Sequence, residues 1–215
     1  PIYLALEYGL VLYYQLYGWL IKKPPSAWQT GSKGEVVLIP GLHERWPFLK
    51  KIGQRLNRLG YRIHVIQALG NNTKATIGQV EIVKQYLQTN HLANVLIVAH
   101  SKGCLITALL LADEESNQLI KQAVTIAAPF RGSRIAWLLP SAHELRPGST
   151  LFENLTEKTD VNKILNLYSA FDNHVLPQSS LLLPRGTNLK IPVWGHSRIS
   201  FQAETCQQIE DFFSQ

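Results

Sequence analysis

Short apolar runs that alternate with helical patterns constrain the fold of this chain more than any other feature. The run at 35–39 lies between Gly34 and Pro40, as buried strands commonly do. Further runs of this kind stand at 61–66, 94–99, 122–127, 164–169 and 189–193. Apolar residues recur at helical spacing near 48–59, 76–89, 102–115 and 201–213. Strands that alternate with helices predict an α/β fold, with a mostly parallel central sheet covered by helices on both faces.

The composition of the chain narrows its class and its partners. With 215 residues, 46% hydrophobic and 17% charged, the chain is expected to fold as a globular protein and not as a disordered or collagen-like one. Its two cysteines, Cys104 and Cys206, form no cluster with zinc spacing, so no metal site is predicted. The net charge of +6 is compatible with an anionic partner. Basic residues interleaved with aromatic ones are missing, so we expect no nucleic-acid partner.

The N-terminal segment has a pattern of its own. Residues 2–21 are predominantly apolar and are followed by Lys22-Lys23 and the helix-stopping Pro24-Pro25. We predict an amphipathic helix within residues 1–25 and place the main domain at 26–215. A helical projection collects Tyr3, Glu7, Tyr14, Gly18 and Lys22 on one stripe and puts the leucines elsewhere. Such a helix either packs on the protein's own surface or associates with a membrane, and the pattern fits both interpretations.

The segment 96–104 carries the strongest chemical signal. An apolar strand runs into Ala99-x-Ser101-x-Gly103 and then directly into a helix. Small residues two positions before and two after the serine let strand and helix approach each other in a tight turn that exposes the hydroxyl. The segment resembles the nucleophile elbow of the α/β-hydrolases. We therefore predict Ser101 as a nucleophile.

A serine nucleophile needs a base that is oriented by a carboxylate. In the α/β-hydrolases that the elbow resembles, the acid and then the histidine follow the serine along the chain. Asp172 comes just after the strand at 164–169, and His196 just after the strand at 189–193. Both would lie at the carboxyl edge of the sheet, beside Ser101. We predict the triad Ser101, Asp172 and His196; the alternatives are His174 as the base and Asp172 as a turn residue.

The wider resemblance is to small bacterial lipases and esterases of the α/β-hydrolase superfamily. It is carried by segments 36–41, 99–103, 127–133, 145–149 and 195–196. It implies an α/β-hydrolase fold with a minimal lid and cleavage of acyl esters, those of lipids included, without a cofactor. It also implies that the backbone N–H groups of Leu42 and Lys102 form an oxyanion hole. Thioesterases and acyltransferases use the same triad, and an inactive fold of this kind can serve as a binding scaffold.

Two further sets of residues complete the prediction. The irregular segment 130–163 is expected to form a short lid or inserted loop, and its apolar residues to line an acyl pocket. The pocket candidates are His43, Phe130, Trp137, Leu138 and Leu139. A basic stripe along the second predicted helix and just after it comprises Lys51, Arg55, Arg58 and Arg62. The stripe is either an ordinary solvated helix face or, together with residues 2–21, a contact with an anionic membrane, which would make the protein membrane-associated.

Overall fold

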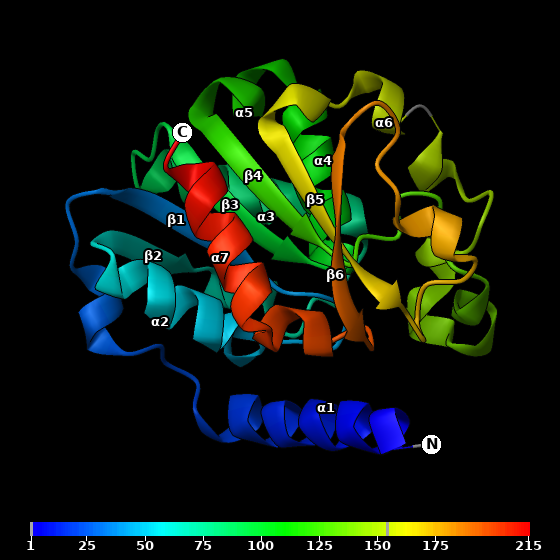
Figure 1. Cartoon of the computed structure of the whole chain (residues 1–215). Helices are drawn as coiled ribbons and strands as arrows, with labels where there is room; N and C mark the ends of the chain where they lie inside the picture. Colours follow the sequence, from blue (N-terminus) through cyan, green and yellow to red (C-terminus); the bar gives the residue numbers. More distant parts are fainter. Residues whose placement is uncertain (1, 154) are drawn as a thin grey trace.

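The computed structural model describes residues 2–153 and 155–215, and its centre is one six-stranded sheet (Figure 1). The strand order is β2-β1-β3-β4-β5-β6, and every neighbouring pair is parallel. The strands are β1 (Gly34–Ile39), β2 (Tyr61–Val65), β3 (Val95–His100), β4 (Ile120–Ile126), β5 (Ile164–Phe171) and β6 (Thr187–Trp194). Because β2 and β3 lie on opposite sides of β1, the chain reverses its winding direction at the carboxyl ends of β1 and β3, where ligands bind in open α/β sheets.

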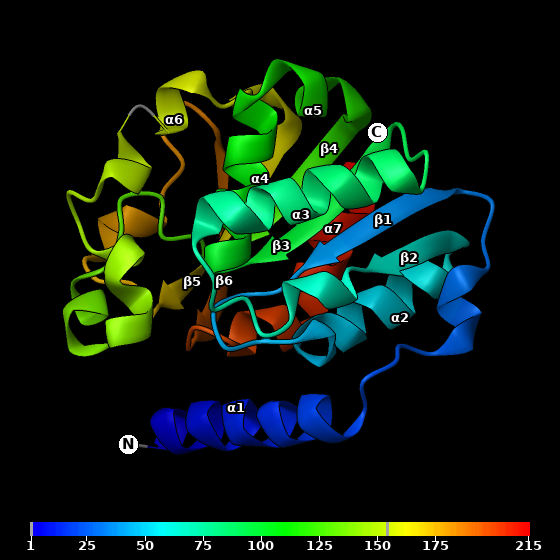
Figure 2. The same cartoon turned by 180° about the vertical axis from the view of Figure 1, so that it is seen from behind.

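Helices cover both faces of this sheet. One face carries α3 (Thr76–Thr89) and α4 (Lys102–Ala112), and the other carries α2 (Lys50–Arg58) and α7 (Ala203–Phe213) (Figure 2). The remaining helices are α1 (Ile2–Leu20), α5 (Glu114–Leu119) and α6 (Leu155–Lys158). The predicted mostly parallel sheet with helices on both faces is thereby confirmed.

The core consists of two apolar clusters, one on each side of the sheet. Val37 and Ile39 of β1 belong to the cluster under α3 and α4, whereas Val36 and Leu38 belong to the cluster under α2 and α7. All four side chains are buried. A strand that is apolar at consecutive positions is needed because both of its faces are covered.

The helix predicted at 102–115 is interrupted in the structure. It ends as α4 at Ala112, and α5 begins at Glu114. Asp113 separates the two helices, with extended backbone angles and a carboxylate that accepts hydrogen bonds from the Ser116 N–H (3.0 Å) and hydroxyl (2.7 Å). An aspartate N-cap of this kind starts a new helix, and it outweighs the continuous apolar pattern in this region.

The segment between β4 and β5 contains only short helices. These include the 3₁₀ helices η4 (Arg134–Leu138), η5 (Pro140–Leu145) and η6 (Thr150–Phe152), together with α6. The part with η4 and η5 lies beyond the carboxyl ends of the central strands, whereas α6 lies near the start of β5 (Figure 1). We refer to residues 134–145 as the flap.

Helix α1 lies across the carboxyl edge of the sheet and is joined to β1 by a linker that contains η1 (Ser26–Gln29) (Figure 1). It packs on the body through the stripe that includes Glu7 and Gly18, both of which are buried. None of the helices in the described part of the chain is both long and apolar enough to cross a membrane.

Three residues of the basic stripe, on α2 and at the start of β2, have partners within the chain. Lys51 donates to the carbonyl of Phe201 (2.6 Å), Arg55 pairs with Glu210, and Arg62 contacts Glu35 (3.4 Å). Ion pairs at exposed positions contribute little to stability, so these contacts orient the side chains more than they hold the fold.

Candidate active site

Ser101 occupies a strained turn between β3 and α4. Its φ of +51° lies in the left-handed region, which non-glycine residues rarely adopt, and its N–H donates to the Ile126 carbonyl (2.8 Å). A Cβ atom on Gly103 would lie 2.3 Å from the Ile39 carbonyl oxygen, so only glycine fits where α4 crosses the end of β1. This packing holds the Ser101 hydroxyl at the carboxyl edge of the sheet.

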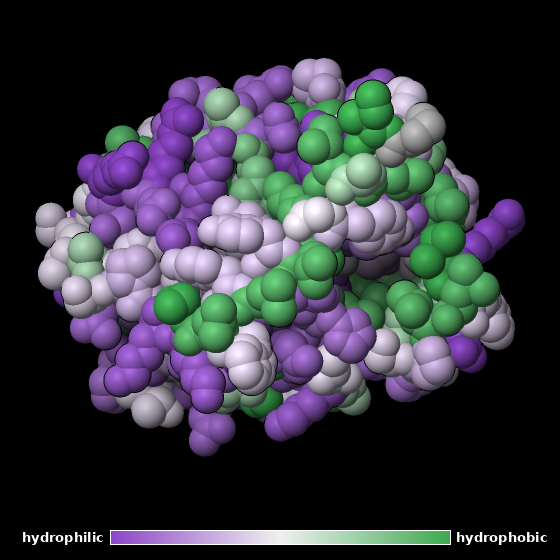
Figure 3. Space-filling view, turned by 90° about the horizontal axis from the view of Figure 1, so that it is seen from below, coloured by the Kyte–Doolittle hydropathy of each residue, from purple (hydrophilic) through white to green (hydrophobic). Residues whose placement is uncertain are grey.

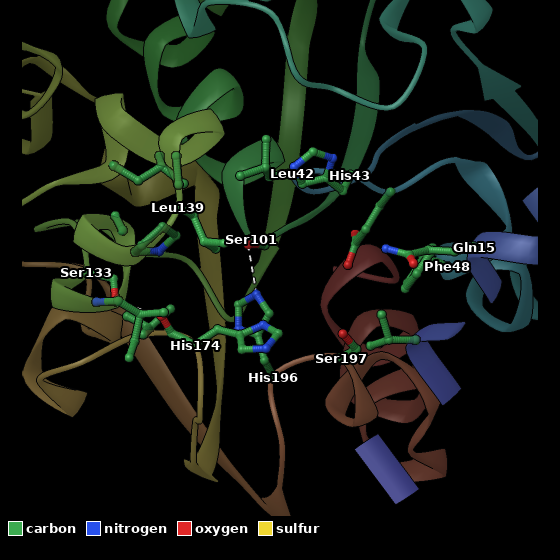
Figure 4. Close-up of a pocket in the computed structure, with 18 residues that line it drawn as sticks. Gln15, Leu42, His43, Phe48, Ser101, Ser133, Leu139, His174, His196 and Ser197 are labelled. Atoms are coloured by element: carbon green, nitrogen blue, oxygen red, sulfur yellow. Dashed lines mark hydrogen bonds between the residues drawn. The ribbon is translucent and has the colours of Figure 1, made fainter. Parts of the chain in front are cut away.

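The predicted triad residues are linked by two hydrogen bonds, of which Figure 4 shows the one between Ser101 and His196. The Ser101 hydroxyl lies 2.8 Å from Nε2 of His196, and Nδ1 of His196 lies 2.7 Å from Oδ2 of Asp172. Asp172 is completely buried, and His196 is 4% exposed. With Nδ1–H donating to the carboxylate, Nε2 is free to accept the serine proton.

The Asp172 carboxylate is held by backbone groups as well as by His196. Its Oδ1 accepts hydrogen bonds from the N–H groups of His174 (2.7 Å) and Val175 (2.8 Å). Burial opposes ionisation, but the attraction to His196 and these hydrogen bonds outweigh it, so the pKa of Asp172 lies below its ordinary value. The carboxylate is therefore ionised beside the imidazole. It accepts hydrogen bonds from the turn and contacts His196 at the same time, so the two alternatives for Asp172 do not exclude each other.

His174, the alternative base, has a different position. Its ring lies 4.8 Å from the His196 ring, centroid to centroid, and it contributes to the pocket wall (Figure 4). Burial, followed by repulsion from His196, lowers the pKa of His174 to about 4, so the ring is neutral at pH 7. Ser101 and Asp172 make their side-chain hydrogen bonds with His196 and not with this ring.

The two predicted oxyanion donors flank Ser101. Lys102 follows it in the chain, and the loop that carries Leu42 passes beside it, since a Cβ atom on Gly41 would lie 2.9 Å from the Ser101 Cβ. In the part of the chain that the structure describes, neither the Leu42 nor the Lys102 N–H donates to a protein acceptor. Unpaired N–H groups beside a nucleophile are what an oxyanion would require.

The Lys102 side chain runs away from the reacting face and is buried. Its ammonium donates to the carbonyls of Asn72 (3.2 Å) and Lys74, and it lies 3.4 Å from Oε1 of Glu144 in the flap. Burial lowers the pKa of Lys102, and the nearby Glu144 carboxylate opposes this effect. Lys102 therefore ties the elbow to the 72–74 loop and to the flap.

A second acid–imidazole pair, Glu44 and His100, is buried behind the triad. Nδ1 of His100 lies 2.8 Å from Oε2 of Glu44, and Nε2 lies 3.1 Å from the carbonyl oxygen of His196. When Glu44 is ionised, both partners accept, so both ring nitrogens donate and His100 is the protonated member of an ion pair. Glu44 also accepts from the Gly41 N–H (2.7 Å), so the pair joins the Leu42 loop to the His196 loop.

Substitution of Glu44 by glutamine is expected to lower the free energy of unfolding by about 3–5 kcal/mol near pH 6, because it leaves a buried imidazolium unpaired. Burial disfavours both charges, but their mutual attraction prevails: the pKa of Glu44 lies below, and that of His100 above, its ordinary value. Glu44 therefore stabilises the fold above about pH 4.5 and loses this effect in acid, whereas His100 stabilises it below about pH 6.5 and loses this effect in base.

Urea unfolding at a series of pH values would measure this difference between wild type and Glu44→Gln. The loss of stability should be greatest between about pH 4.5 and 6.5 and should shrink on both sides. Glu81→Gln, at an exposed position, removes the same charge and serves as the control. A difference that does not change with pH would contradict a charged Glu44–His100 pair.

A cavity of about 190 Å³ opens directly onto Ser101 and His196 (Figure 4). Its wall is mostly apolar. It includes residues of α1, the loop after β1 and the flap, together with residues of the serine turn and of the loops after β4, β5 and β6. Among the predicted pocket residues, His43 and Leu139 lie in this wall. Phe130 is instead buried in the core cluster under α3 and α4, and Trp137 and Leu138 are 61% and 76% exposed on the molecular surface.

The sequence interpretation missed several residues of the cavity wall. Val11 and Gln15 come from α1, and Phe48 from the start of the helical segment after β1. Ser133 also contributes, and its hydroxyl donates to the His174 carbonyl (2.6 Å). No local pattern marks these positions, because they reach the cavity through the docking of α1 and the path of the flap.

Helix α1 contacts the loop that carries His196 through Glu7. Its buried carboxylate accepts hydrogen bonds from the N–H groups of Ser197 (2.6 Å) and Arg198 (3.1 Å), directly after His196. A Cβ atom on Gly195 would lie 2.4 Å from a Glu7 oxygen, so glycine is required at that position. Helix α1 is thereby attached to the loop that carries the predicted base.

Comparison with known proteins finds similarity in structure only. No protein-family model matches the sequence, and no curated protein matches it. Among solved structures, Aspergillus fumigatus lipase B has a TM-score of 0.70 at 16% identity, with 86% of this chain and 54% of that chain covered. A hydrolase from Oleispira antarctica has a TM-score of 0.63 at 16% identity, with 86% and 93% covered.

A monoacylglycerol lipase from Paleococcus ferrophilus is similar to the same extent, with a TM-score of 0.63 at 14% identity and 86% and 96% of the two chains covered. At identities this low, the likeness concerns the fold and not the substrate. It agrees with the strand order and with the strained serine turn after β3. This chain has the α/β-hydrolase fold.

Proposed function

We propose that this protein is a serine ester hydrolase of the lipase or carboxylesterase type, acting on acyl esters through an acyl-serine intermediate. The observation that carries the proposal is the chain of hydrogen bonds from Ser101 through His196 to Asp172 at the wall of an apolar cavity. A hydroxyl bonded to an imidazole, which is itself bonded to a buried carboxylate, is the arrangement that activates serine as a nucleophile.

In the proposed reaction, His196 takes the proton of Ser101 as Oγ attacks the acyl carbonyl carbon. The negative oxygen of the tetrahedral intermediate accepts hydrogen bonds from the Leu42 and Lys102 N–H groups. His196 then gives its proton to the leaving alcohol, and the acyl group stays on Ser101. Water deprotonated by His196 attacks the acyl-serine and releases the acid, while Asp172 stabilises the imidazolium that forms in both steps.

The cavity wall supports an acyl substrate. Most of its accessible surface is apolar, and the flap residues Ile135, Ala136 and Leu139 lie in the same wall as Ser101. Apolar walls with a few polar groups near the reacting atom fit a hydrocarbon chain that ends in an ester. Lipases among the structural neighbours add support for this substrate class, at the level of fold analogy.

The test is a series of esters with acyl chains from short to long, each presented dissolved and as an emulsion. Initial rates are measured for wild type and for Ser101→Ala. Serine-dependent rates that rise toward long, aggregated esters indicate a lipase, and rates confined to short, dissolved esters indicate an esterase. A matching series of acyl thioesters distinguishes a thioesterase. No serine-dependent turnover in either series would overturn the proposal in favour of a binding scaffold.

A further inference from the structure

The rotation of α1 about its own axis is fixed by its contacts with the body. Glu7 is bonded to the loop after His196, and the Tyr14 ring stacks on Phe201 with centroids 4.6 Å apart. Near the other end, the Tyr17 hydroxyl accepts a hydrogen bond from Lys50 (2.7 Å), and Gly18 packs against Arg45. The stripe that contains the only acidic residue of the helix therefore faces inward, so the opposite stripe faces outward.

The outward stripe of α1 is apolar and carries no charge. Its side chains are between 51% and 78% exposed, although burial would be favourable for each of them. They are Ile2, Leu6, Tyr8, Leu12, Tyr13, Leu16, Trp19 and Leu20. A packed amphipathic helix of a soluble domain presents polar residues to water, so the orientation of α1 is the reverse of the usual one.

The exposed apolar surface continues across the cavity mouth onto the flap. Trp137, Leu138 and Leu139 are 61%, 76% and 47% exposed. Val11 and Gln15 of α1 share the wall of one cavity with Leu139, so that cavity opens between the helix and the flap. Figure 3 shows this face, with an apolar band along α1, further apolar side chains over the flap and a hollow beside them. Continuous exposed apolar surface of this kind marks an interaction site.

The charges and aromatic rings at its margin identify the partner. Lys22 and Lys23 follow the helix at one end, and the Arg146 guanidinium lies 4.6 Å from the centre of the Trp137 ring at the flap. Tyrosine and tryptophan side chains favour the boundary between water and lipid, and basic residues favour lipid phosphates. A lipid surface fits this combination, because its hydrocarbon can contact the apolar centre of the exposed surface and its phosphates can contact the basic residues at the margin.

We propose that the outer stripe of α1 and the flap tip, residues 137–139, form one docking surface for the face of a lipid bilayer. The helix lies in the plane of the interface and does not cross the membrane. This proposal rests on the proposed function in one respect: with the cavity mouth on the docked face, a lipid ester reaches Ser101 from the lipid layer without passing through water. Docking itself requires no catalysis.

The test measures co-flotation with vesicles in the Ser101→Ala background, so that hydrolysis does not change the lipid. Vesicles contain either phosphatidylcholine alone or equal parts of phosphatidylcholine and phosphatidylglycerol. Leu12→Glu on α1 and Leu138→Glu on the flap are each expected to lower the partition coefficient at least tenfold, since each places a charge against hydrocarbon. Leu59→Glu, an exposed leucine at the end of α2, is the matched control and should leave partition unchanged.

The same substitutions are then made in the active enzyme, and its hydrolysis of a dissolved short-chain ester is measured. This measurement separates the docking proposal from the proposed function. Leu12→Glu and Leu138→Glu are expected to retain this hydrolysis, while losing activity on emulsified esters. Vesicle binding that all three substitutions leave unchanged would overturn the docking surface, whatever the hydrolysis rates. The proposal would also be overturned if the wild-type protein does not bind vesicles and sediments as a dimer that Leu12→Glu dissociates. The partner of this surface would then be a second copy of the chain.

Discussion

Ser101→Ala is expected to lower kcat for ester hydrolysis by about 10⁴-fold or more, because the substitution removes the hydroxyl oxygen that is bonded to Nε2 of His196. Residual turnover would come from water held in the same cavity beside the Leu42 and Lys102 N–H groups. The fold should be unaffected, since alanine has the same Cβ atom in the left-handed turn and loses one hydroxyl. Steady-state rates and thermal unfolding midpoints of the two proteins measure both effects.

Ser179→Ala provides the control for this experiment. Ser179 is exposed in the 3₁₀ helix η8 (Gln178–Leu181), so its substitution removes a hydroxyl without touching the cavity. Both substitutions should leave the unfolding midpoint nearly unchanged, and only Ser101→Ala should abolish turnover. Ester hydrolysis that Ser101→Ala retains would exclude Ser101 as the nucleophile.

Asp172→Asn is expected to lower kcat by about 10⁴-fold at pH 7. The asparagine oxygen can still accept the N–H groups of His174 and Val175, so the loop should keep its shape. Its amide nitrogen then faces Nδ1 of His196 and donates to it, which forces the ring proton onto Nε2. An Nε2 that carries a proton cannot accept one from Ser101, and no carboxylate remains to stabilise the imidazolium.

The matched control for the charge is Asp211→Asn on the exposed side of α7. It removes one carboxylate from the surface and should leave kcat within about twofold, since exposed charges far from the site act through a screening solvent. Measuring kcat and KM separately distinguishes a loss of catalysis from a loss of substrate binding. Asp172→Asn is expected to lower kcat and to leave KM nearly unchanged. A KM effect with unchanged kcat would assign Asp172 to substrate binding instead.

The fold was predictable because its signals are local. Each strand of a parallel sheet that is covered on both faces reads as a short apolar run, and the runs at 35–39 and 94–99 lie within one residue of β1 and β3. The Ser101 turn was predictable for the same reason, since the small residues Ala99 and Gly103 stand only two positions from the serine. The interruption of the helix at Asp113 follows from a capping residue that the apolar pattern concealed.

The predicted triad depended on topology and not on local pattern. Asp172 and His196 stand at the ends of strands, and a parallel sheet brings all such ends to one edge. Together with the serine–acid–histidine order of the α/β-hydrolases that the elbow resembles, this position made them candidates. The choice between His196 and His174 required coordinates, because both residues lie in loops at this edge and only the ring positions distinguish them.

The buried pair of Glu44 and His100, and the contact of Glu7 with the loop after His196, were beyond sequence reasoning. Glu7 and Ser197 lie 190 positions apart, and no periodicity links them. The projection grouped Glu7 and Gly18 on one stripe of α1, and pattern alone does not say which stripe faces the body. The buried Glu7 carboxylate settles it, because a charge removed from water must find donors, and the Ser197 and Arg198 N–H groups supply them.

The most direct measurement for the central claim is the mass of the protein after rapid acid quenching during turnover of a slowly deacylated ester. The account predicts one acyl group per chain, located on the peptide that contains Ser101, and no adduct in Ser101→Ala. An acyl group on a different residue, or an adduct that persists in Ser101→Ala, would contradict it.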